Sequence, residues 1–426
     1  MLDKNLIRKS PEIVKKDLMK RGDVEKIKWV DELLRYDKMS RELRKRIDDL
    51  RHKRNVISRK VAMLKKNGRD ATKEIEEISA VKMEIEELER KRKGYVDKVN
   101  YFLMRLPNIL DESVPIGKDE TENVEIRSWG EIPKFNFKPR DHIELMRGLN
   151  LVELERAAKV SGARFYYLRD ELVILNIALI KFGLDFLKER GFTLVEPPFM
   201  IRRKPYEGVT ALSDFEDVLY KIEGEDLYLI ATSEHPLASM HMDEVLDGRL
   251  LPIKYAGVSP CFRKEAGAHG KDTKGIFRVH QFDKVEQFVF CRPENSRRMH
   301  EELIRNAEEF FQKLEIPYRI VNICTGDIGT VAAKKYDLEA WMPSQGRYRE
   351  VVSCSNCTDY QARRLNIRYR EKPGAKASYV HTLNSTLVAT QRTMVAILEN
   401  YQQEDGSIRV PKVLQPYMGG MKVIGG

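Results

Sequence analysis

The feature that most limits the fold is a repeat of apolar residues in the first hundred positions. They recur at steps of three or four in two runs, 39–64 and 78–102, which is the spacing of a coiled-coil seam. Between the runs, Asn67-Gly68-Arg69-Asp70 is a sequence that ends helices. We therefore expect an antiparallel helical hairpin whose arms extend about 55 Å, too long to be covered by an ordinary domain. The expected seam residues are Met39, Leu43, Ile47, Leu50, Ile57, Val61, Leu64, Ile78, Val81, Ile85, Leu88, Tyr95, Val99 and Phe102.

The charge of the chain is concentrated in the same hairpin. Residues 41 to 69 contain twelve Lys or Arg residues and three acids, a net charge of +9 in a chain whose total is +10. A dimerisation coil is the more common use of such a hairpin. A strongly basic face is instead typical of a surface that binds a polyanionic backbone, because Lys and Arg release condensed counterions from it.

Beyond the hairpin the pattern changes to a mixture of helices and strands. A segment rich in Pro, Gly and acids follows Pro107-Asn108, so we place a domain boundary near residue 110. Helices are expected at 172–190 and 296–314, and strands at 227–231, 287–291, 318–321 and 348–352. This mixture predicts an α+β domain with an antiparallel sheet. The sequence lacks a Gly-rich phosphate loop, so a nucleotide would have to be held by side chains.

The remaining composition narrows the protein class. No run of 18 apolar residues occurs, and the first residues are charged throughout, so we expect no membrane span and a cytoplasmic protein. The five cysteines are scattered over the second half and predict no disulfide framework. Cys354 and Cys357 form a CxxC pair, but no second pair accompanies them, so we expect no zinc site.

The segment from Tyr255 to Cys291 is the strongest candidate for a site. It reads as strand, loop and strand, and alternation would place Arg263 and Glu265 on one face of the first strand and Phe282 and Glu286 on one face of the second. Arginine can bind phosphate or carboxylate through two donors. From spacing alone, a surface ladder of salt bridges is the more common explanation of such a pattern.

Longer motifs overturn that explanation. The sequences FRKE at 262–265 and GIFRVHQFDKVEQF at 275–288 resemble motif 2 of class II aminoacyl-tRNA synthetases, in the form of the seryl enzymes. Segments at 161–172, 232–237, 350–364 and 381–402 are similar to that family in the same order, and so are the first residues and the basic hairpin. The resemblance covers essentially the whole chain. It implies an antiparallel sheet of six or seven strands in a catalytic domain of residues 111–426, preceded by a tRNA-binding coiled-coil domain of residues 1–110.

The resemblance also implies roles for the residues that would bind ATP. Arg263 would hold the α-phosphate and the serine carboxylate, Glu265 the adenine amino group, and Phe282 would stack on adenine. Arg278 and Arg392 would bind the outer phosphates, with Arg263 and Arg392 as the catalytic pair. Glu350 and Ser353 would position ATP and its Mg²⁺. The matching ATP-binding positions are Arg263, Lys264, Glu265, Arg278, Val279, Phe282, Glu350, Val351, Val352, Ser353 and Arg392.

A second group of matching positions would bind L-serine. By resemblance, Thr232, Ser233 and Glu234 form the loop that closes on the amino acid, and Arg263 binds its carboxylate. Glu286, Asn384 and Thr386 would surround the ammonium and hydroxyl groups. Motif 3 departs from that of many bacterial relatives: it has Asn384-Ser385-Thr386 in place of Asn-Gly-Ser, a form similar to archaeal and eukaryotic enzymes.

The function implied is that of a serine–tRNA ligase acting on ATP, L-serine and tRNA(Ser), and on tRNA(Sec) where a cell has it. Residues 172–200 resemble motif 1, which implies a homodimer; from spacing alone this helix is an ordinary amphipathic core helix. Two other functions remain open at this point. One is a synthetase-like paralogue that does not aminoacylate tRNA, and the other is a non-enzymatic basic coiled-coil protein that binds RNA.

Overall fold

The structure is a computed structural model that describes residues 1–211, 213, 218–266, 272 and 274–425. The chain divides into two compact units, Met1–Pro107 and Asn108–Gly426, each with its own buried core. Within the described part of the chain, no helix is both long and apolar enough to cross a membrane.

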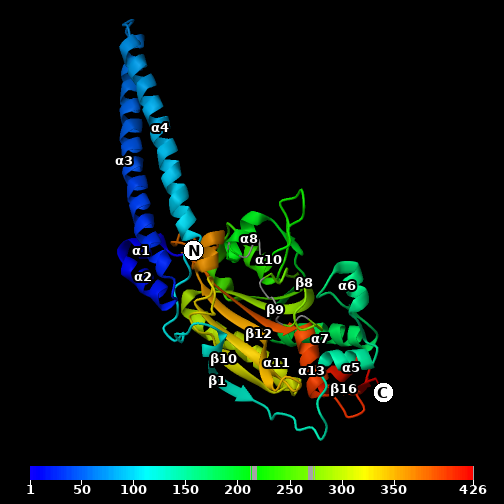
Figure 1. Cartoon of the computed structure of the whole chain (residues 1–426). Helices are drawn as coiled ribbons and strands as arrows, with labels where there is room; N and C mark the ends of the chain where they lie inside the picture. The colour runs from blue at the N-terminus through cyan, green and yellow to red at the C-terminus, as the bar shows by residue number, and fades with distance from the viewer. Residues whose placement is uncertain (212, 214–217, 267–271, 273, 426) are drawn as a thin grey trace. The chain divides into compact units, whose positions relative to one another are not determined.

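The first unit is the expected helical hairpin with two short helices before it. Helices α1 (Lys4–Lys9) and α2 (Pro11–Lys20) precede α3 (Val24–Lys66) and α4 (Thr72–Leu103), which run antiparallel against each other (Figure 1). The expected seam is confirmed at its centre, where Ile47, Leu50, Val81 and Ile85 form a buried cluster. Gly68 lies in the turn with a positive φ of 64°, a conformation that a residue with a Cβ atom adopts only with strain.

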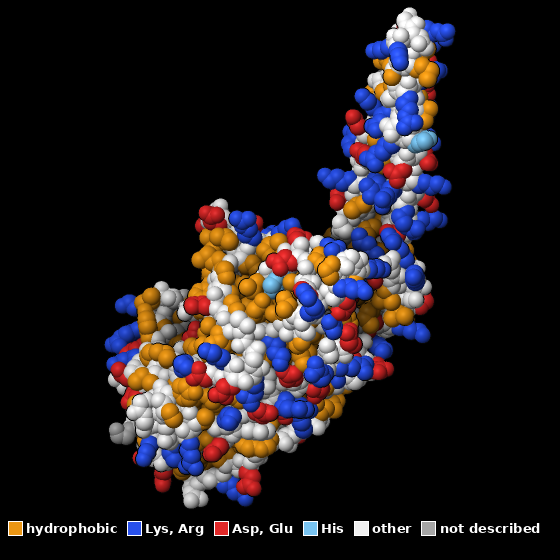
Figure 2. All heavy atoms as spheres, turned by 180° about the vertical axis from the view of Figure 1, so that it is seen from behind, with side chains coloured by type: hydrophobic (Ala, Val, Ile, Leu, Met, Phe, Trp, Pro, Cys, Tyr) orange, Lys and Arg blue, Asp and Glu red, His pale blue; other side chains and the backbone are white. Residues whose placement is uncertain are grey.

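Ion pairs between the two helices change the charge expected for the hairpin. Four basic side chains of α3 contact carboxylates of α4: Arg46–Glu84 at 3.2 Å, Arg51–Glu89 at 2.7 Å, Lys53–Glu77 at 2.7 Å and Lys60–Glu74 at 3.0 Å. The net charge of +9 counted along one segment therefore overstates the charge that faces solvent, because the neighbouring helix supplies acids. Lys and Arg side chains are nevertheless distributed along the whole length of the hairpin (Figure 2).

The second unit is built on an eight-stranded sheet, one or two strands more than expected. Its strand order is β1-β10-β11-β12-β15-β9-β8-β4; β4 pairs in parallel with β8, and the other neighbours are antiparallel. These strands are β1 (Val124–Trp129), β4 (Thr193–Val195), β8 (Ile253–Phe262), β9 (Gln281–Cys291), β10 (Tyr318–Asn322), β11 (Lys334–Met342), β12 (Arg347–Thr358) and β15 (His381–Ala389). The short strands are β2 (Val152–Glu153), β3 (Tyr167–Leu168), β5 (Met200–Ile201), β6 (Tyr228–Leu229), β7 (Val245–Asp247), β13 (Arg368–Arg370), β14 (Ser378–Tyr379), β16 (Ile408–Arg409) and β17 (Val423–Ile424).

Helices cover the two faces of this sheet unequally. Helices α7 (Glu171–Glu189), α11 (Ser296–Lys313) and α13 (Thr390–Asn400) pack on one face and form the main core with it (Figure 1). Helices α10 (Glu234–Ser239) and α12 (Tyr360–Leu365) pack on the other face, over Phe288 and Phe290. The other α-helices in the described part of this unit are α5 (His142–Gly148), α6 (Glu155–Ser161) and α8 (Arg203–Val209).

Alternation along β9 assigns its side chains to these two faces. Val285 and Val289 enter the core beneath α7 and α11, whereas Lys284 and Glu286 point to the opposite face. Part of that opposite face is left uncovered by helices, and polar side chains gather there.

Each expected helix and strand overlaps an observed one, with ends that differ by up to six residues, but besides the number of strands one further expectation is wrong. The first strand of the motif 2 hairpin ends at Phe262, so Arg263 and Glu265 lie beyond it and do not share a strand face. Glu265 has a positive φ of 51°, which breaks the alternation that extended backbone would impose. Part of the Gly-rich loop of this hairpin, 267–271 and 273, lies outside the described residues.

Candidate active site

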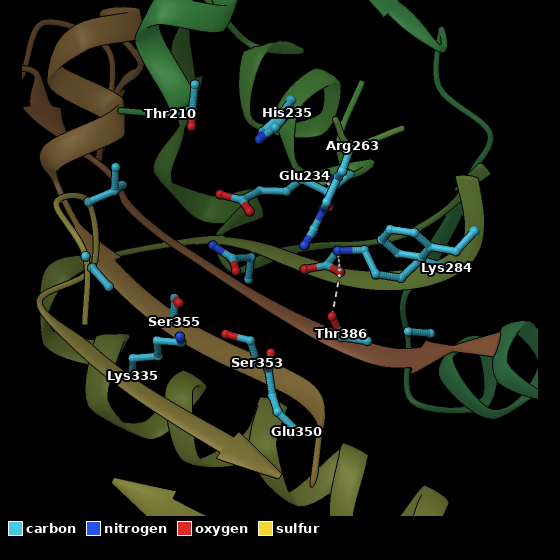
Figure 3. Close-up of a pocket in the computed structure, with 18 of the residues that line it drawn as sticks. Thr210, Glu234, His235, Arg263, Lys284, Lys335, Glu350, Ser353, Ser355 and Thr386 are labelled. Atoms are coloured by element: carbon cyan, nitrogen blue, oxygen red, sulfur yellow. Dashed lines mark hydrogen bonds and ion pairs between the residues drawn. The ribbon is translucent and has the colours of Figure 1, made fainter. Parts of the chain in front are cut away.

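A cavity of about 440 Å³ opens on the uncovered face of the sheet. Side chains reach it from β9, β11, β12 and β15, from the loop after β8 and from α10 (Figure 3), and Arg392 of α13 also lines it. Because these elements come from residues 234 to 400 of the chain, only the folded sheet brings their side chains together.

One end of the cavity carries arginines arranged around an aromatic ring. The guanidinium carbon of Arg392 lies 5.1 Å from the ring centroid of Phe277, and both residues line the cavity; Arg349, whose guanidinium carbon lies 4.3 Å from the same ring, is not among the lining residues. Nearby, Arg278 donates to the carboxylate of Glu265 at 2.8 Å. Guanidinium groups held in this way are suited to bind several phosphate oxygens at once.

Arg392 on α13 and Glu350 on β12 form the link between this end and the sheet. Nη1 of Arg392 donates to the backbone carbonyl of Glu350 at 3.0 Å and lies 3.3 Å from its carboxylate. Burial alone would raise the pKa of Glu350, but Arg392, Lys335 and Arg263 outweigh it and hold the pKa at about 2. Glu350 is therefore an anion that can bind a cation at neutral pH.

Arg263 occupies the middle of the cavity. Its guanidinium lies 5.1 Å from the ring centroid of Phe282 and donates to the carbonyl of Ala231 at 3.3 Å. The backbone of Arg263 is fixed by His280, whose carbonyl accepts from the Arg263 amide at 2.9 Å. This arrangement leaves the guanidinium at the boundary between the arginine-rich end and the polar residues described next.

A polar niche lies beside Arg263, where β9 pairs with β15. Glu286 is only 2% exposed; its carboxylate contacts the ammonium of Lys284 at 2.7 Å and accepts from the hydroxyl of Thr386 at 3.2 Å. Asn384 also faces the niche, and its amide donates to the thiol of Cys357 at 3.7 Å. A small ligand with an ammonium and a hydroxyl group would find partners for both here.

The loop before α10 closes another side of this niche. Thr232 and Glu234 line the cavity, and the carboxylate of Glu234 accepts from the amide of Gln361 at 2.9 Å. Burial and the neighbouring charge of Glu286 raise the pKa of Glu234 to about 7. Ser233 is fully buried and its hydroxyl donates instead to the carbonyl of Gly257 at 3.3 Å.

Most residues singled out from the sequence meet in this one cavity. Those that line it are Thr232, Glu234, Arg263, Glu265, Arg278, Val279, Phe282, Glu286, Glu350, Val351, Ser353, Asn384, Thr386 and Arg392. Among the described residues, Ser233, Lys264 and Val352 do not line it. Val352 packs in the core on the other face of β12.

Sequence reasoning missed two lysines that line the cavity, Lys284 and Lys335. A signal for Lys284 was present, because it lies two residues from both Phe282 and Glu286 and so shares their strand face. Lys335 lies on β11 and is the register partner of Ser355 on β12, which also lines the cavity. Only this strand pairing indicates that Lys335 belongs to the site. The pairing of these two strands is a feature of the tertiary structure and cannot be found by alternation along one strand.

The two cysteines of the CxxC pair do not point the same way. The thiol of Cys354 contacts the carbonyl of His300 on the core face, whereas Cys357 lines the cavity. Two thiols on opposite faces of one strand do not form a pair of metal ligands.

The chain resembles characterised proteins over its full length. Residues 218–401 match the class II core domain of tRNA synthetases (G, H, P, S and T), and residues 1–110 match the seryl-tRNA synthetase N-terminal domain. The serine–tRNA ligase of Thermococcus sibiricus is 57% identical over 100% of this chain and 98% of its own length.

Two solved structures agree with these matches. Seryl-tRNA synthetase from Pyrococcus horikoshii, solved in complex with ATP, has a TM-score of 0.94 at 57% identity and covers 100% of this chain and 99% of its own. The cytoplasmic serine–tRNA ligase from Naegleria fowleri, solved with AMP, has a TM-score of 0.88 at 39% identity and covers 100% and 98%. Matches of this identity and coverage in both sequence and structure establish that the chain belongs to the seryl-tRNA synthetase family of class II aminoacyl-tRNA synthetases.

Proposed function

We propose that the chain activates L-serine with ATP to give seryl-adenylate and pyrophosphate, and then transfers the seryl group to tRNA(Ser). The observation that carries the proposal is the single cavity in which an arginine-rich end adjoins a small polar niche. Family membership and the ATP and AMP complexes of the two solved relatives support it. The non-enzymatic alternative gives no reason for so many buried charges to meet on one sheet face.

In the first step the serine carboxylate attacks the α-phosphorus, and pyrophosphate leaves. Such a displacement needs charge neutralisation and alignment more than a protein acid or base. We assign the outer phosphates to Arg278 and Arg392, and the α-phosphate and serine carboxylate to Arg263. Phe282, already 5.1 Å from the Arg263 guanidinium, would stack on adenine, and Glu265 would accept from its amino group.

Glu350 and Ser353 are suited to hold Mg²⁺ with the nucleotide. Both line the cavity from β12 and present oxygen atoms, and the low pKa of Glu350 keeps its carboxylate charged. Mg²⁺ is usually held by one or two carboxylates, with substrate phosphates and water completing its shell, so two protein ligands are sufficient. When bound, the ion supplies positive charge against the phosphate oxygens.

The polar niche accounts for the choice of serine. Glu286 and Glu234 are the candidate partners of the ammonium group, and Thr386 and Asn384 are candidates for the hydroxyl. A site that hydrogen-bonds a substrate hydroxyl rejects alanine because its own polar groups would be left unpaired. Threonine must be rejected by lack of space instead.

The hairpin α3–α4 is the proposed tRNA-binding arm. Exposed basic residues that have no α4 carboxylate within ion-pair distance among the described residues include Lys45, Arg59, Lys65 and Lys66. Such side chains are available to phosphates of the RNA backbone, and contacts of this kind recognise shape more than sequence. A tRNA(Sec) of similar shape would be bound and charged in the same way.

We further infer that the chain acts as a homodimer in the cytoplasm. Val173, Ile174 and Ile177 on α7 are 41, 41 and 58% exposed, and Leu194 on the adjacent edge strand β4 is 39% exposed. An apolar group on one helix and one strand edge is typical of a surface that a second copy covers. The cytoplasmic location rests on the role in charging tRNA.

Two assays test the proposed reaction. Serine-dependent exchange of labelled pyrophosphate into ATP measures the first step, and attachment of labelled serine to tRNA(Ser) measures both steps together. Both activities are expected from the purified chain. Absence of exchange would refute the proposal, whereas exchange without charging would point to a paralogue that makes only the adenylate.

A further inference from the structure

A half-buried lysine lines the cavity, and neither ATP nor serine has been assigned to it as a ligand. Lys335 lies on β11, and its side chain is 20% exposed and faces the cavity (Figure 3). Its ammonium is 3.5 Å from the carboxylate of Asp337, longer than a charge-assisted hydrogen bond of about 2.8 Å. The donors of this ammonium are therefore not saturated by Asp337 and remain able to bind a further anion.

Lys335 is charged although its side chain is half-buried. Burial alone lowers the pKa of the ammonium, but Asp337, Glu350 and Asp327 outweigh that effect, and the pKa lies above its usual value. The group is thus a fixed cation and not a base. A cation inside a cavity favours an anionic group of a ligand over a neutral one.

The strand order places Lys335 far from the nucleobase end. From β11 the sheet continues through β12 and β15 to β9, so three strand spacings, about 14 Å, separate the two strands, and the register places Lys335 opposite Phe288, six residues along β9 from Phe282. The cavity around Lys335 is lined by Gly329, Thr330 and Val331 of the turn before β11 and by Ser355 of β12. No part of the adenylate has been assigned to these residues, which leaves this side of the cavity for a further group.

The second step of the proposed reaction brings such a group. The terminal ribose hydroxyl of tRNA forms an ester bond with the seryl carbonyl carbon, the bond from that carbon to the phosphate oxygen breaks, and AMP leaves with the hydroxyl proton. Because the adenylate fills the arginine-rich end, the ribose must enter from another side. Its 5′-phosphodiester enters with it and carries a negative charge.

We propose that Lys335 binds the terminal phosphodiester of the tRNA acceptor end and so positions the ribose hydroxyl for seryl transfer. This proposal rests on the function proposed above. The turn 328–332 forms the wall against which the terminal nucleotide lies. Lys335 thereby acts chiefly in the second step; in the first it only adds, with Arg392 and Arg263, to the positive charge that keeps Glu350 ionised.

The test compares the two steps in one variant and its control. Lys335→Met keeps the aliphatic stem and removes the charge. Lys334→Met is the matched control, because Lys334 is the neighbouring residue on β11 and its ammonium lies over the ring of Tyr336, on the other face of the strand. Transfer from preformed enzyme-bound seryl-adenylate to tRNA is measured in single turnovers, alongside pyrophosphate exchange. For Lys335→Met the ratio of transfer to exchange is expected to fall on the order of 10- to 100-fold, the contribution of one charged hydrogen bond, and for Lys334→Met the ratio is expected to stay.

A change in the RNA tests the same contact without altering the protein fold. A tRNA whose last internucleotide linkage is a methylphosphonate lacks the charge that Lys335 is proposed to bind. It should slow transfer by the wild-type chain but add nothing to the defect of Lys335→Met, since both changes remove one interaction. Unchanged wild-type transfer with this tRNA would overturn the proposal, even if Lys335→Met failed to fold. An equal loss of exchange and transfer in Lys335→Met would assign the ammonium to the phosphates of the first step. Absence of exchange in the wild type would instead refute the proposed function itself.

Discussion

Thr386 on β15 donates its hydroxyl hydrogen to the carboxylate of Glu286 on β9 at 3.2 Å, and the two residues are register partners. Because the hydrogen is committed to Glu286, the oxygen of Thr386 faces a ligand as an acceptor. A ligand hydroxyl at this point must therefore donate, as serine can and alanine cannot.

Replacing Thr386 tests this orientation. Thr386→Val keeps the shape and removes the hydroxyl, so kcat/KM for serine in pyrophosphate exchange is expected to fall on the order of 10- to 100-fold. Exchange with alanine should change little, because alanine has no hydroxyl to lose a partner. Thr386→Ser retains the hydroxyl and should keep most of the preference for serine over alanine. Equal losses with serine and alanine would show that Thr386 has only a packing role.

Arg392 is expected to be indispensable in the first step. Arg392→Gln removes a guanidinium held against Glu350, and exchange should fall at least on the order of 100-fold because phosphate charge is left unneutralised. Arg392→Lys restores the charge without the planar pair of donors and should recover only part of the rate. Arg409→Gln serves as the control, because Arg409 is exposed on β16 outside the cavity. If Arg392→Gln showed normal exchange, Arg392 would not be a ligand of the ATP phosphates.

The raised pKa of Glu234 predicts a pH-dependent affinity for serine. With a pKa of about 7, the carboxylate is mostly protonated at about pH 6 and mostly charged at about pH 8. Only the charged form attracts the ammonium of serine, so the Kd should decrease about tenfold between these values as the pH rises. Calorimetric titrations at about pH 6, in buffers of different ionisation enthalpy, should detect the release of a proton when serine binds.

The matched variant for this prediction is Glu234→Gln. It removes the titrating group and should make serine binding weak and nearly independent of pH. A wild-type Kd that stays constant over this range would show that Glu234 does not contact the ammonium.

The hairpin is expected to bind tRNA through its unpaired charges. Replacing Arg59, Lys65 and Lys66 together by Ala should weaken tRNA binding and reduce the slope of log Kd against log salt by about two to three, while exchange stays normal. The matched triple variant replaces Arg46, Arg51 and Lys60, which contact carboxylates of α4. It should reduce the slope less, since those charges are already partly neutralised. If both triple variants reduced the slope equally, ion pairing with α4 would not determine which basic residues bind tRNA.

The exposed apolar residues of α7 predict the oligomeric state. Ile177→Glu places a charge on the proposed dimer surface and should yield monomers in light scattering coupled to gel filtration. Ile116→Glu is the control, because Ile116 is 74% exposed and its segment lies near β10, toward the opposite edge of the sheet from β4. A wild-type chain that is monomeric at micromolar concentration would refute the dimer.

The sequence alone determined the features that depend on short separations along the chain. The apolar period and the breaker at Gly68 were sufficient for the helical hairpin, because coiled-coil packing follows from spacing. Continuous motifs were sufficient for the family and for most residues of the cavity. Alternation along β9 would also have identified Lys284, which lies between two residues already chosen.

Tertiary structure decided the features that depend on which elements become neighbours. Acids of α4 neutralise part of the charge on α3, which a count along one segment misses. Ser233 and Val352 lie within the right motifs, yet local backbone geometry turns their side chains away from the cavity. Lys335 enters the cavity because β11 pairs with β12, and β12 lies two places from β9 through β15. Periodicity assigns a residue to a face of its own strand, but the order of strands from distant parts of the chain determines which residues meet on that face.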